Sequence, residues 1–288
     1  MIRVSIPALI SIAFGSSAMS AQCTPAVQKL INGRQFDAAL GQLAALTSRS
    51  PADDKALDCT GRLYMERGDA DKAIEWLDRA VAAKPADAQH HQQLGLALRT
   101  AATAGNMFTQ MRLGPRMKSE LERAIELDPA SVDARLALVQ LYAQAPSGMG
   151  GDTAKAREQA VAIVKYSPMR AHIANGLLAE LTKNAPLAEK EFLAAIDARP
   201  DSEAAYASAG NFYRRAARYD EAIAMYEKQL KGAPADWSSV RRSNAHYNIG
   251  LAYQSSGRKD LAKSEFQLAL TANPDNENAK KALASPGG

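Results

Sequence analysis

The sequence is poor in aromatic residues and in residues that perform covalent or metal chemistry. Aromatic residues make up 6% of the chain, which has only four histidines and two cysteines. The sequence has no Gly-x-Ser-x-Gly elbow, phosphate-binding loop, dinucleotide fingerprint or paired-cysteine zinc motif. No histidine has a histidine or cysteine partner at metal-ligand spacing. These absences predict a protein that is not an enzyme and that uses no metal or cofactor.

The chain also lacks a strong charge of either sign. Lysine and arginine number 35 against 31 acidic residues, a formal net charge of +4. No continuous basic stripe with interleaved aromatic residues occurs, and such a stripe is the usual mark of nucleic-acid binding. The composition therefore predicts no nucleic-acid partner. A hydrophobic content of 47% is that of an ordinary folded protein.

Long hydrophobic runs are absent, and the only apolar stretch near the N-terminus is short. Residues 1–21 carry one cation, Arg3, then an apolar stretch over 4–14 and small residues over 15–21, which is the order of a secretory signal peptide. Spanning a membrane takes about 20 apolar residues, so we expect no stable membrane insertion. We expect an exported protein of the bacterial periplasm, with cleavage near residue 18–21, after Ala18, Ser20 or Ala21.

A fixed spacing of small, bulky and proline residues recurs along the remaining chain. From Gly61 it runs through Tyr64, Gly68, Ala73, Leu77, Ala80 and Pro85. From Gly250 it runs through Tyr253, Gly257, Ala262, Phe266, Ala269 and Pro274, and from Gly210 through Tyr213, Ala217, Ala222, Tyr226, Gln229 and Pro234. Bulky residues at helical intervals and a proline that stops each second helix predict repeated pairs of packed helices.

This spacing resembles that of the tetratricopeptide repeat (TPR) family, whose unit of about 34 residues is an antiparallel pair of helices, A and B. The resemblance implies an all-α fold, a right-handed α-solenoid of about seven helix pairs with a C-terminal capping helix. We expect a signal peptide over 1–21, an array over 22–284 and a disordered tail over 285–288. The expected units are 20–53, 54–87, 88–131, 132–170, 169–202, 203–236 and 243–276, with the cap at 277–284.

Three insertions interrupt the array, and they resemble those of exported bacterial TPR proteins. They fall within 100–117, at 146–152 and around 236–242. We expect helix B of the third unit to begin at Gly114 and Pro115, and residues 236–242 to lengthen helix A of the last unit. The first insertion is apolar enough either to bind a partner or to pack on the array, through Met107, Phe108, Met111 and Leu113. The thioethers of Met107, Met111, Met117 and Met149 give an alternative function, the carriage of a soft metal or small molecule.

The two cysteines fall at similar levels of the A helices in units one and two, which are neighbours in a TPR stack. In an oxidising periplasm this placement predicts a disulfide between Cys23 and Cys59, and two separate buried thiols are the alternative. His91, His172 and His246 each lie four residues before a repeat glycine, where we expect packing residues rather than ligands.

The resemblance also implies where a partner would bind, because A helices line the concave surface of a TPR array. The side chains expected to face this groove mix amides, apolar groups and arginines, which suits a peptide or a partner helix. They are Arg62, Gln92, Leu96, Arg99, Gln140, Leu177, Asn211, Arg214, Tyr247, Leu251 and Gln254. We therefore expect a non-enzymatic scaffold or adaptor that binds a protein or peptide partner.

Overall fold

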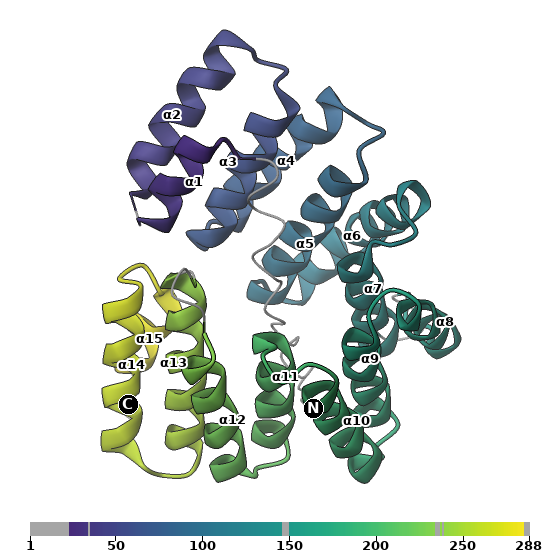
Figure 1. Ribbon diagram of the computed structural model, residues 1–288, viewed down its shortest axis with the longest axis vertical. Coiled ribbons are helices and arrows are strands. Elements are labelled where there is room, and N and C mark those ends of the chain that lie inside the picture. Colours follow the sequence, from purple (N-terminus) through teal and green to yellow (C-terminus); the bar gives the residue numbers. More distant parts are fainter. Residues whose placement is uncertain (1–22, 34, 146–149, 234–236, 238, 285–288) are drawn as a thin grey trace.

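The computed structural model describes residues 23–33, 35–145, 150–233, 237 and 239–284, and all regular elements within these ranges are α-helices (Figure 1). The helices are α1 (Pro25–Asn32), α2 (Phe36–Arg49), α3 (Asp54–Glu66), α4 (Ala70–Ala83), α5 (Ala88–Ala104), α6 (Met107–Leu127), α7 (Val132–Gln144), α8 (Thr153–Val164), α9 (Pro168–Leu181), α10 (Ala185–Ala198), α11 (Glu203–Arg215), α12 (Tyr219–Lys231), α13 (Ser239–Ser255), α14 (Lys259–Ala272) and α15 (Glu277–Ala284).

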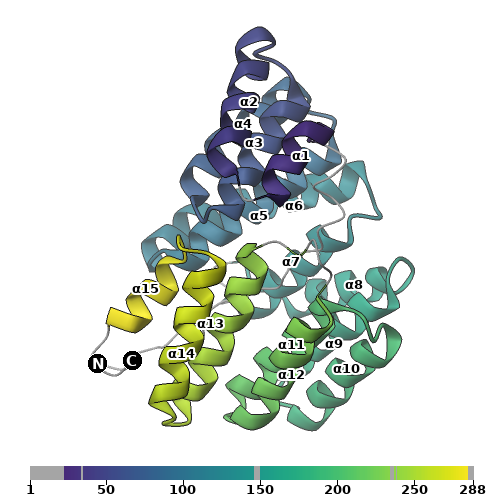
Figure 2. The ribbon, with the colours of Figure 1, turned by 60° about the vertical axis from the view of Figure 1, so that its left-hand side comes forward.

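Consecutive helices pair as antiparallel hairpins that stack side by side in chain order. In Figure 1 the path runs from α1–α4 at the top, through α5–α8 at the right, to α13–α15 at the lower left. Figure 2 shows that the last hairpin comes to lie below the first ones, so the superhelix makes nearly one turn. This is the right-handed α-solenoid of TPR helix pairs, with α15 as the cap, that the sequence predicted.

The repeat glycines make close contact between the two helices of a pair possible. A Cβ atom built on Gly250 would lie 2.5 Å from Cε1 of Phe266, and one on Gly61 would lie 2.5 Å from Cγ of Leu77. On Gly176 the distance to Cε1 of Phe192 would be 2.8 Å. Since no real Cβ atom fits at such distances, only glycine lets the bulky side chain of helix B lie against the backbone of helix A.

Both ends of the array are covered by shorter helices. Val27 stands in α1 where a repeat glycine would stand, and it is fully buried against the first hairpin. At the other end Asn276 caps α15 by accepting a hydrogen bond from the backbone N–H of Ala279, and its amide donates to Ser243 Oγ at 2.8 Å. The predicted capping helix is therefore present, and Ser243 ties it to α13.

The predicted start of α6 at Gly114 and Pro115 is wrong. The helix begins at Met107, where Asn106 caps it by accepting a hydrogen bond from the backbone N–H of Thr109, and Pro115 lies inside the helix. A proline there removes one backbone hydrogen bond of the preceding turn, and because Pro115 is exposed, water can replace it. The insertion therefore lengthens α5 and α6 together instead of forming a loop between them.

The other two insertions differ in outcome. Helix α13 has 17 residues, against 13 in α11, so the predicted lengthening of the last A helix is confirmed. In the 146–152 segment, Gly151 and Asp152 lie outside any helix, and Asp152 caps α8 through the backbone N–H groups of Ala154 and Lys155. Residues 146–149, the signal-peptide prediction over 1–21, the tail prediction over 285–288 and Met149 lie outside the described residues.

A disulfide joins Cys23, just before α1, to Cys59 in the middle of α3, with 5.3 Å between the two Cα atoms. Both cysteines are buried, together with Val27, Ile31 and Leu63. The predicted pairing is therefore the one the structure contains, and it fastens the first helix to the second hairpin. Within the described residues, no helix is both long and apolar enough to cross a membrane.

Candidate functional site

The A helices α3, α5, α7, α9, α11 and α13 carry the residues predicted to line the groove, and the structure divides these residues into two groups. The first group is buried: Arg62, Gln92, Leu96, Arg99, Gln140, Leu177 and Asn211. The second group is half-exposed: Arg214, Tyr247, Leu251 and Gln254. The accessible members of the predicted site therefore lie on α11 and α13, in the last two repeats.

A polar network connects the buried arginines of the middle repeats. Arg99 on α5 donates to Oε1 of Gln140 on α7 at 2.8 Å, and Arg170 on α9 lies 3.4 Å from Asp133 on α7. Burial lowers the pKa of Arg99 to about 10, while the negative charge of Asp133 acts in the opposite direction. The acceptor oxygen of Gln140 is thus occupied, and its buried amide nitrogen has no partner within the described part of the chain.

A buried tyrosine–asparagine pair lies beside Arg214, which belongs to the half-exposed group. Tyr226 on α12 donates to Oδ1 of Asn211 at 2.8 Å, which leaves the Asn211 amide nitrogen as the group that a ligand could use. Burial raises the pKa of Tyr247, and the charge of nearby Arg214 opposes that shift. Nε of Arg214 has no hydrogen-bond partner within the described residues. We call Asn211, Arg214, Tyr247, Leu251 and Gln254 the α11–α13 surface.

The predicted insertion contact set also divides. Met107, Phe108 and Met111 are 52%, 85% and 55% exposed, whereas Leu113 is buried in the core between α5 and α6. Met117 is also buried, one turn beyond Leu113. The methionines therefore do not converge on one enclosed space among the described residues, and nothing in this geometry supports the soft-metal or small-molecule alternative.

Sequence reasoning missed a buried histidine cluster between α3 and α5. The His90 ring lies 3.1 Å from Asp54 Oδ2 and 3.4 Å from Asp58 Oδ1, and Asp87 lies 3.9 Å away. Burial acts to lower the pKa of His90, but hydrogen bonds to Asp58 and Asp54 and the charges of Asp58 and Asp87 outweigh it, so the pKa is raised. The signal was present in the sequence as two aspartates four residues apart, on the A helix of the unit before that of the histidine.

Asp54, Asp87 and His90 lie close enough to share a cation. However, the Lys84 ammonium lies 2.9 Å from Asp87 Oδ2 and 3.8 Å from Asp54 Oδ2, so both carboxylates already have a cationic partner. The cluster therefore acts as a buried ion-pair network that joins successive A helices. Arg62 extends it through Asp58 at 3.4 Å.

The other three histidines make one repeated contact that was also missed. In each, the Nδ1 atom of the histidine ring is hydrogen-bonded to a glutamate Oε2 atom. The distance is 2.8 Å for His172 and Glu191, 2.8 Å for His246 and Glu265, and 2.7 Å for His91 and Glu120. In each pair the histidine is on helix A and the glutamate on helix B of the same unit. We expected packing residues rather than ligands at these positions, and each histidine does lie against a neighbouring helix.

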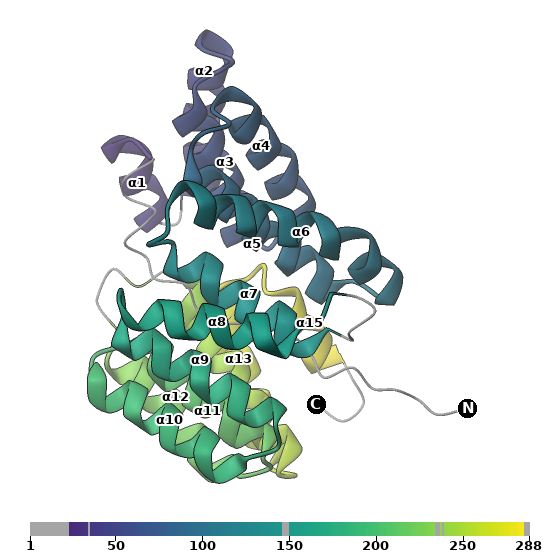
Figure 3. The ribbon, with the colours of Figure 1, turned by 90° about the vertical axis from the view of Figure 1, so that its right-hand side faces the viewer.

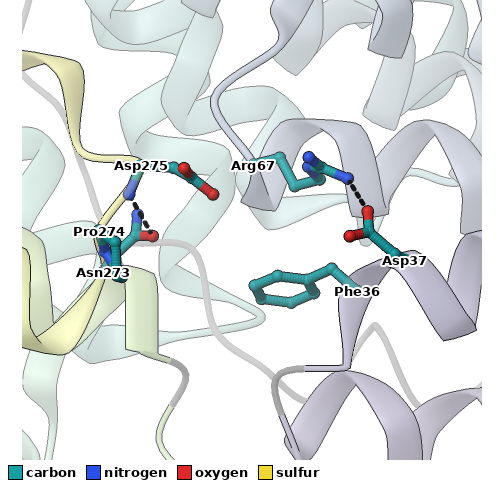
Figure 4. A pocket seen from close by; sticks show the side chains of 6 residues that line it. All are labelled: Phe36, Asp37, Arg67, Asn273, Pro274 and Asp275. Atoms are coloured by element: carbon teal, nitrogen blue, oxygen red, sulfur yellow. Dashed lines mark hydrogen bonds and ion pairs between the residues drawn. The ribbon is translucent and has the colours of Figure 1, made fainter.

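A cavity of about 320 Å³ lies where the two ends of the superhelix approach one another (Figure 4). Phe36, Asp37 and Arg67 line it from α2 and the end of α3. Asn273, Pro274 and Asp275 line it from the turn between α14 and α15. Arg67 pairs with Asp37 at 2.8 Å, on its own side of the cavity. The cavity is open to solvent, and polar side chains outnumber apolar ones along its border. Ligand pockets are mostly apolar, so we interpret this cavity as the gap between the two ends of the array and not as a ligand site.

Comparisons with known proteins agree with this architecture. An 82-residue stretch is 32% identical to anaphase-promoting complex subunit 3 of Schizosaccharomyces pombe, and it covers 28% of this chain but only 11% of that protein. A tetratricopeptide repeat protein from Parabacteroides merdae has a similar structure, with a TM-score of 0.57 at 14% identity, covering 93% of this chain and 98% of the other. The Cut9–Hcn1 structure of the APC/C gives 0.52 at 17% identity, over 90% of this chain and 47% of the other. At these identities the likeness extends to the fold alone.

Three models of the tetratricopeptide repeat match four segments of the chain: residues 26–88 and 150–203 by one model, residues 205–236 by a second, and residues 243–276 by a third. The matched segments include the glycines of α3, α9, α11 and α13 that lie against bulky side chains of the following helix. On these sequence matches and this packing, the chain belongs to the tetratricopeptide repeat family.

Proposed function

We propose that this protein is a non-enzymatic scaffold or adaptor that binds a protein or peptide partner through its concave groove. The observation that carries the proposal is the α11–α13 surface, where half-exposed Arg214 lies near half-exposed Tyr247 on successive A helices. The same two helices carry half-exposed Leu251 and Gln254 and the buried amide of Asn211. Amides can pair with the backbone of an extended peptide, while Leu251 and Tyr247 give its side chains apolar contact. Solenoids of this class commonly use such extended concave surfaces for binding.

We further propose that the protein is exported to the periplasm of a bacterial envelope and that its signal peptide is cleaved near residue 18–21. The order of charged, apolar and small residues over 1–21 supports this proposal. The Cys23–Cys59 disulfide supports it independently, because disulfides persist mainly in oxidising compartments. Under this proposal the partner is another envelope protein, and nucleic acid is not a ligand.

The test is capture of the partner by the mature protein after chemical crosslinking in an envelope extract. The variant Arg214→Ala with Tyr247→Ala removes the charged and aromatic groups of the α11–α13 surface. We expect it to lose capture about tenfold or more, since arginine and tyrosine are the residues that most often dominate an interface. The matched control is Arg157→Ala with Tyr166→Ala, which changes the same residue types at exposed positions on and just after α8.

Equal capture by the groove variant and the α8 control would refute the proposed groove. Circular dichroism of both variants must first show an unchanged helical content, because loss of the fold would also lose the partner. Loss of capture in both variants at unchanged helicity would show that binding is not specific to the α11–α13 surface and would equally contradict the proposal.

A further inference from the structure

The turn between α5 and α6 exposes apolar side chains that the fold itself does not use. Phe108 is 85% exposed, and Met107 and Met111 are 52% and 55% exposed. Residues three and four positions apart are neighbours on a helix surface, so Met111 lies beside both Phe108 and Met107, and the three form one patch at the start of α6. We call residues 105–112 the α5–α6 tip. Figure 3 shows the hairpin that carries it reaching beyond the α3–α4 hairpin, where no neighbouring repeat covers it.

The tip is also positively charged. From Gly105 to Ser119 the sequence contains no acidic residue but three basic ones. Arg116 is paired with Asp78, and Lys118 lies 3.8 Å from Glu122. Arg112 is exposed and makes no ion pair within the described part of the chain. The guanidinium of Arg112 is therefore an unpaired positive charge at the edge of the apolar patch, and it favours an occupant that carries negative charge.

Two occupants fit this arrangement poorly. A second copy of the chain would bring its own Arg112 against the first, and like charges at an interface are unfavourable. Stable attraction to an anionic membrane surface takes a cluster of basic residues, and the tip has only Arg112 free. A three-residue apolar patch is also much shorter than the amphipathic helices that bind membranes.

We infer that the tip binds a helix of a protein partner whose apolar stripe is bordered by aspartate or glutamate. The carboxylates would pair with Arg112, and the flexible thioethers of Met107 and Met111 would adapt to the apolar stripe around Phe108. This inference rests on the proposed function, because it names the chemistry of the protein partner and adds a second contact surface to the groove.

The experiment replaces Phe108 by the photoreactive residue benzoylphenylalanine in the full chain, irradiates producing cells, and sequences the crosslinked product. We expect the product to contain a protein segment of helical periodicity with acidic residues beside its apolar stripe. Its yield should fall about tenfold in the Arg112→Glu background, because the change places like charges together at the rim of the contact. The photoreactive residue at Leu261, 49% exposed on α14, is the matched control and should not give this product.

The synthetic peptide of that segment should bind the purified protein, and its binding should be lost when its acids are replaced by lysine. Crosslinks to lipid, to a second copy or to a segment without acids would overturn the inference. So would an absence of product, or an Arg112→Glu yield equal to that of the unchanged chain. If Arg214→Ala with Tyr247→Ala abolishes capture while the tip gives no product, this inference alone fails. If the tip product persists and that variant captures normally, the proposed groove fails instead.

Discussion

Replacing Gly250 by alanine tests the packing on which every repeat depends. The added Cβ would lie 2.5 Å from Cε1 and 2.6 Å from Cδ1 of Phe266, well inside contact distance. The Phe266 ring is fully buried and packs against the Tyr247 ring, with 5.7 Å between the two ring centroids. It therefore has little room to move away. Overpacking of this kind typically costs about 1–3 kcal/mol.

Alanine also favours a helix over glycine by about 0.8–1.0 kcal/mol, so the two effects oppose one another at Gly250. Gly41 in α2 provides the matched control, because it is exposed and a Cβ there would meet nothing within 4 Å. We expect Gly41→Ala to raise the free energy of unfolding by up to about 1 kcal/mol. Because helix propensity cancels between the two variants, Gly250→Ala should be less stable than Gly41→Ala by about 1–3 kcal/mol, the overpacking cost.

The measurement is urea unfolding followed by circular dichroism, together with hydrogen exchange to locate the loss. In a one-dimensional array the exchange rates of α13 and α14 should rise most, and those of α3 and α4 least. The double variant Gly250→Ala with Phe266→Ala should be more stable than the sum of the single changes predicts, since removing the ring removes the contact with the added Cβ atom. If Gly250→Ala proved as stable as Gly41→Ala, close approach would not be the reason for the repeat glycines.

Three further predictions follow from buried groups. Reducing the Cys23–Cys59 bridge, which closes a loop of 36 residues, should lower the free energy of unfolding by about 3–4 kcal/mol; thiol labelling of the denatured, unreduced protein should find no free cysteine, and two labelled thiols would contradict the bridge. The pKa of His90 is raised above its unfolded value of about 6.5, so the stability it contributes is fully present below that pH and is lost as the pH rises through the folded pKa. His90→Gln should abolish that part of the pH dependence, and a nuclear magnetic resonance titration placing the His90 pKa below 6.5 would contradict it. Tyr226→Phe removes the donor to Asn211 and should cost about 1–2 kcal/mol by urea unfolding; a neutral result would show that the Asn211 oxygen finds another donor.

The sequence predicted the helix pairs because their packing follows a strict spacing. Gly176 and Phe192 lie sixteen positions apart, as do Gly250 and Phe266, and both pairs are in contact. Such a relation is visible in a single sequence because the repeats supply internal copies for comparison. The same reasoning paired Cys23 with Cys59, and the structure joins them, although Cys23 lies just before α1 and not within it.

The contacts that sequence reasoning missed connect residues whose chemistry is ordinary in isolation. His172 and Glu191 meet across a hairpin, as do His246 and Glu265, nineteen positions apart in both cases. Each histidine was recognised as a repeated position, but its glutamate lies on an otherwise solvated face of helix B. The pairing becomes visible only when both helices are placed. The cluster around His90 depends on packing between successive units, which the spacing within one unit does not describe.

The error at Pro115 explains why the α5–α6 tip exists. Proline is accepted at a first helical position, so the sequence favoured a helix beginning there, but Asn106 provides a side-chain cap eight residues earlier. Starting the helix at Met107 turns the insertion into added turns on both α5 and α6, which have 17 and 21 residues. Those turns project past the α3–α4 hairpin, and their outward side chains Met107, Phe108 and Met111 remain exposed. A loop could have folded Phe108 back onto the core, whereas a rigid helical extension holds it in solvent unless a partner covers it.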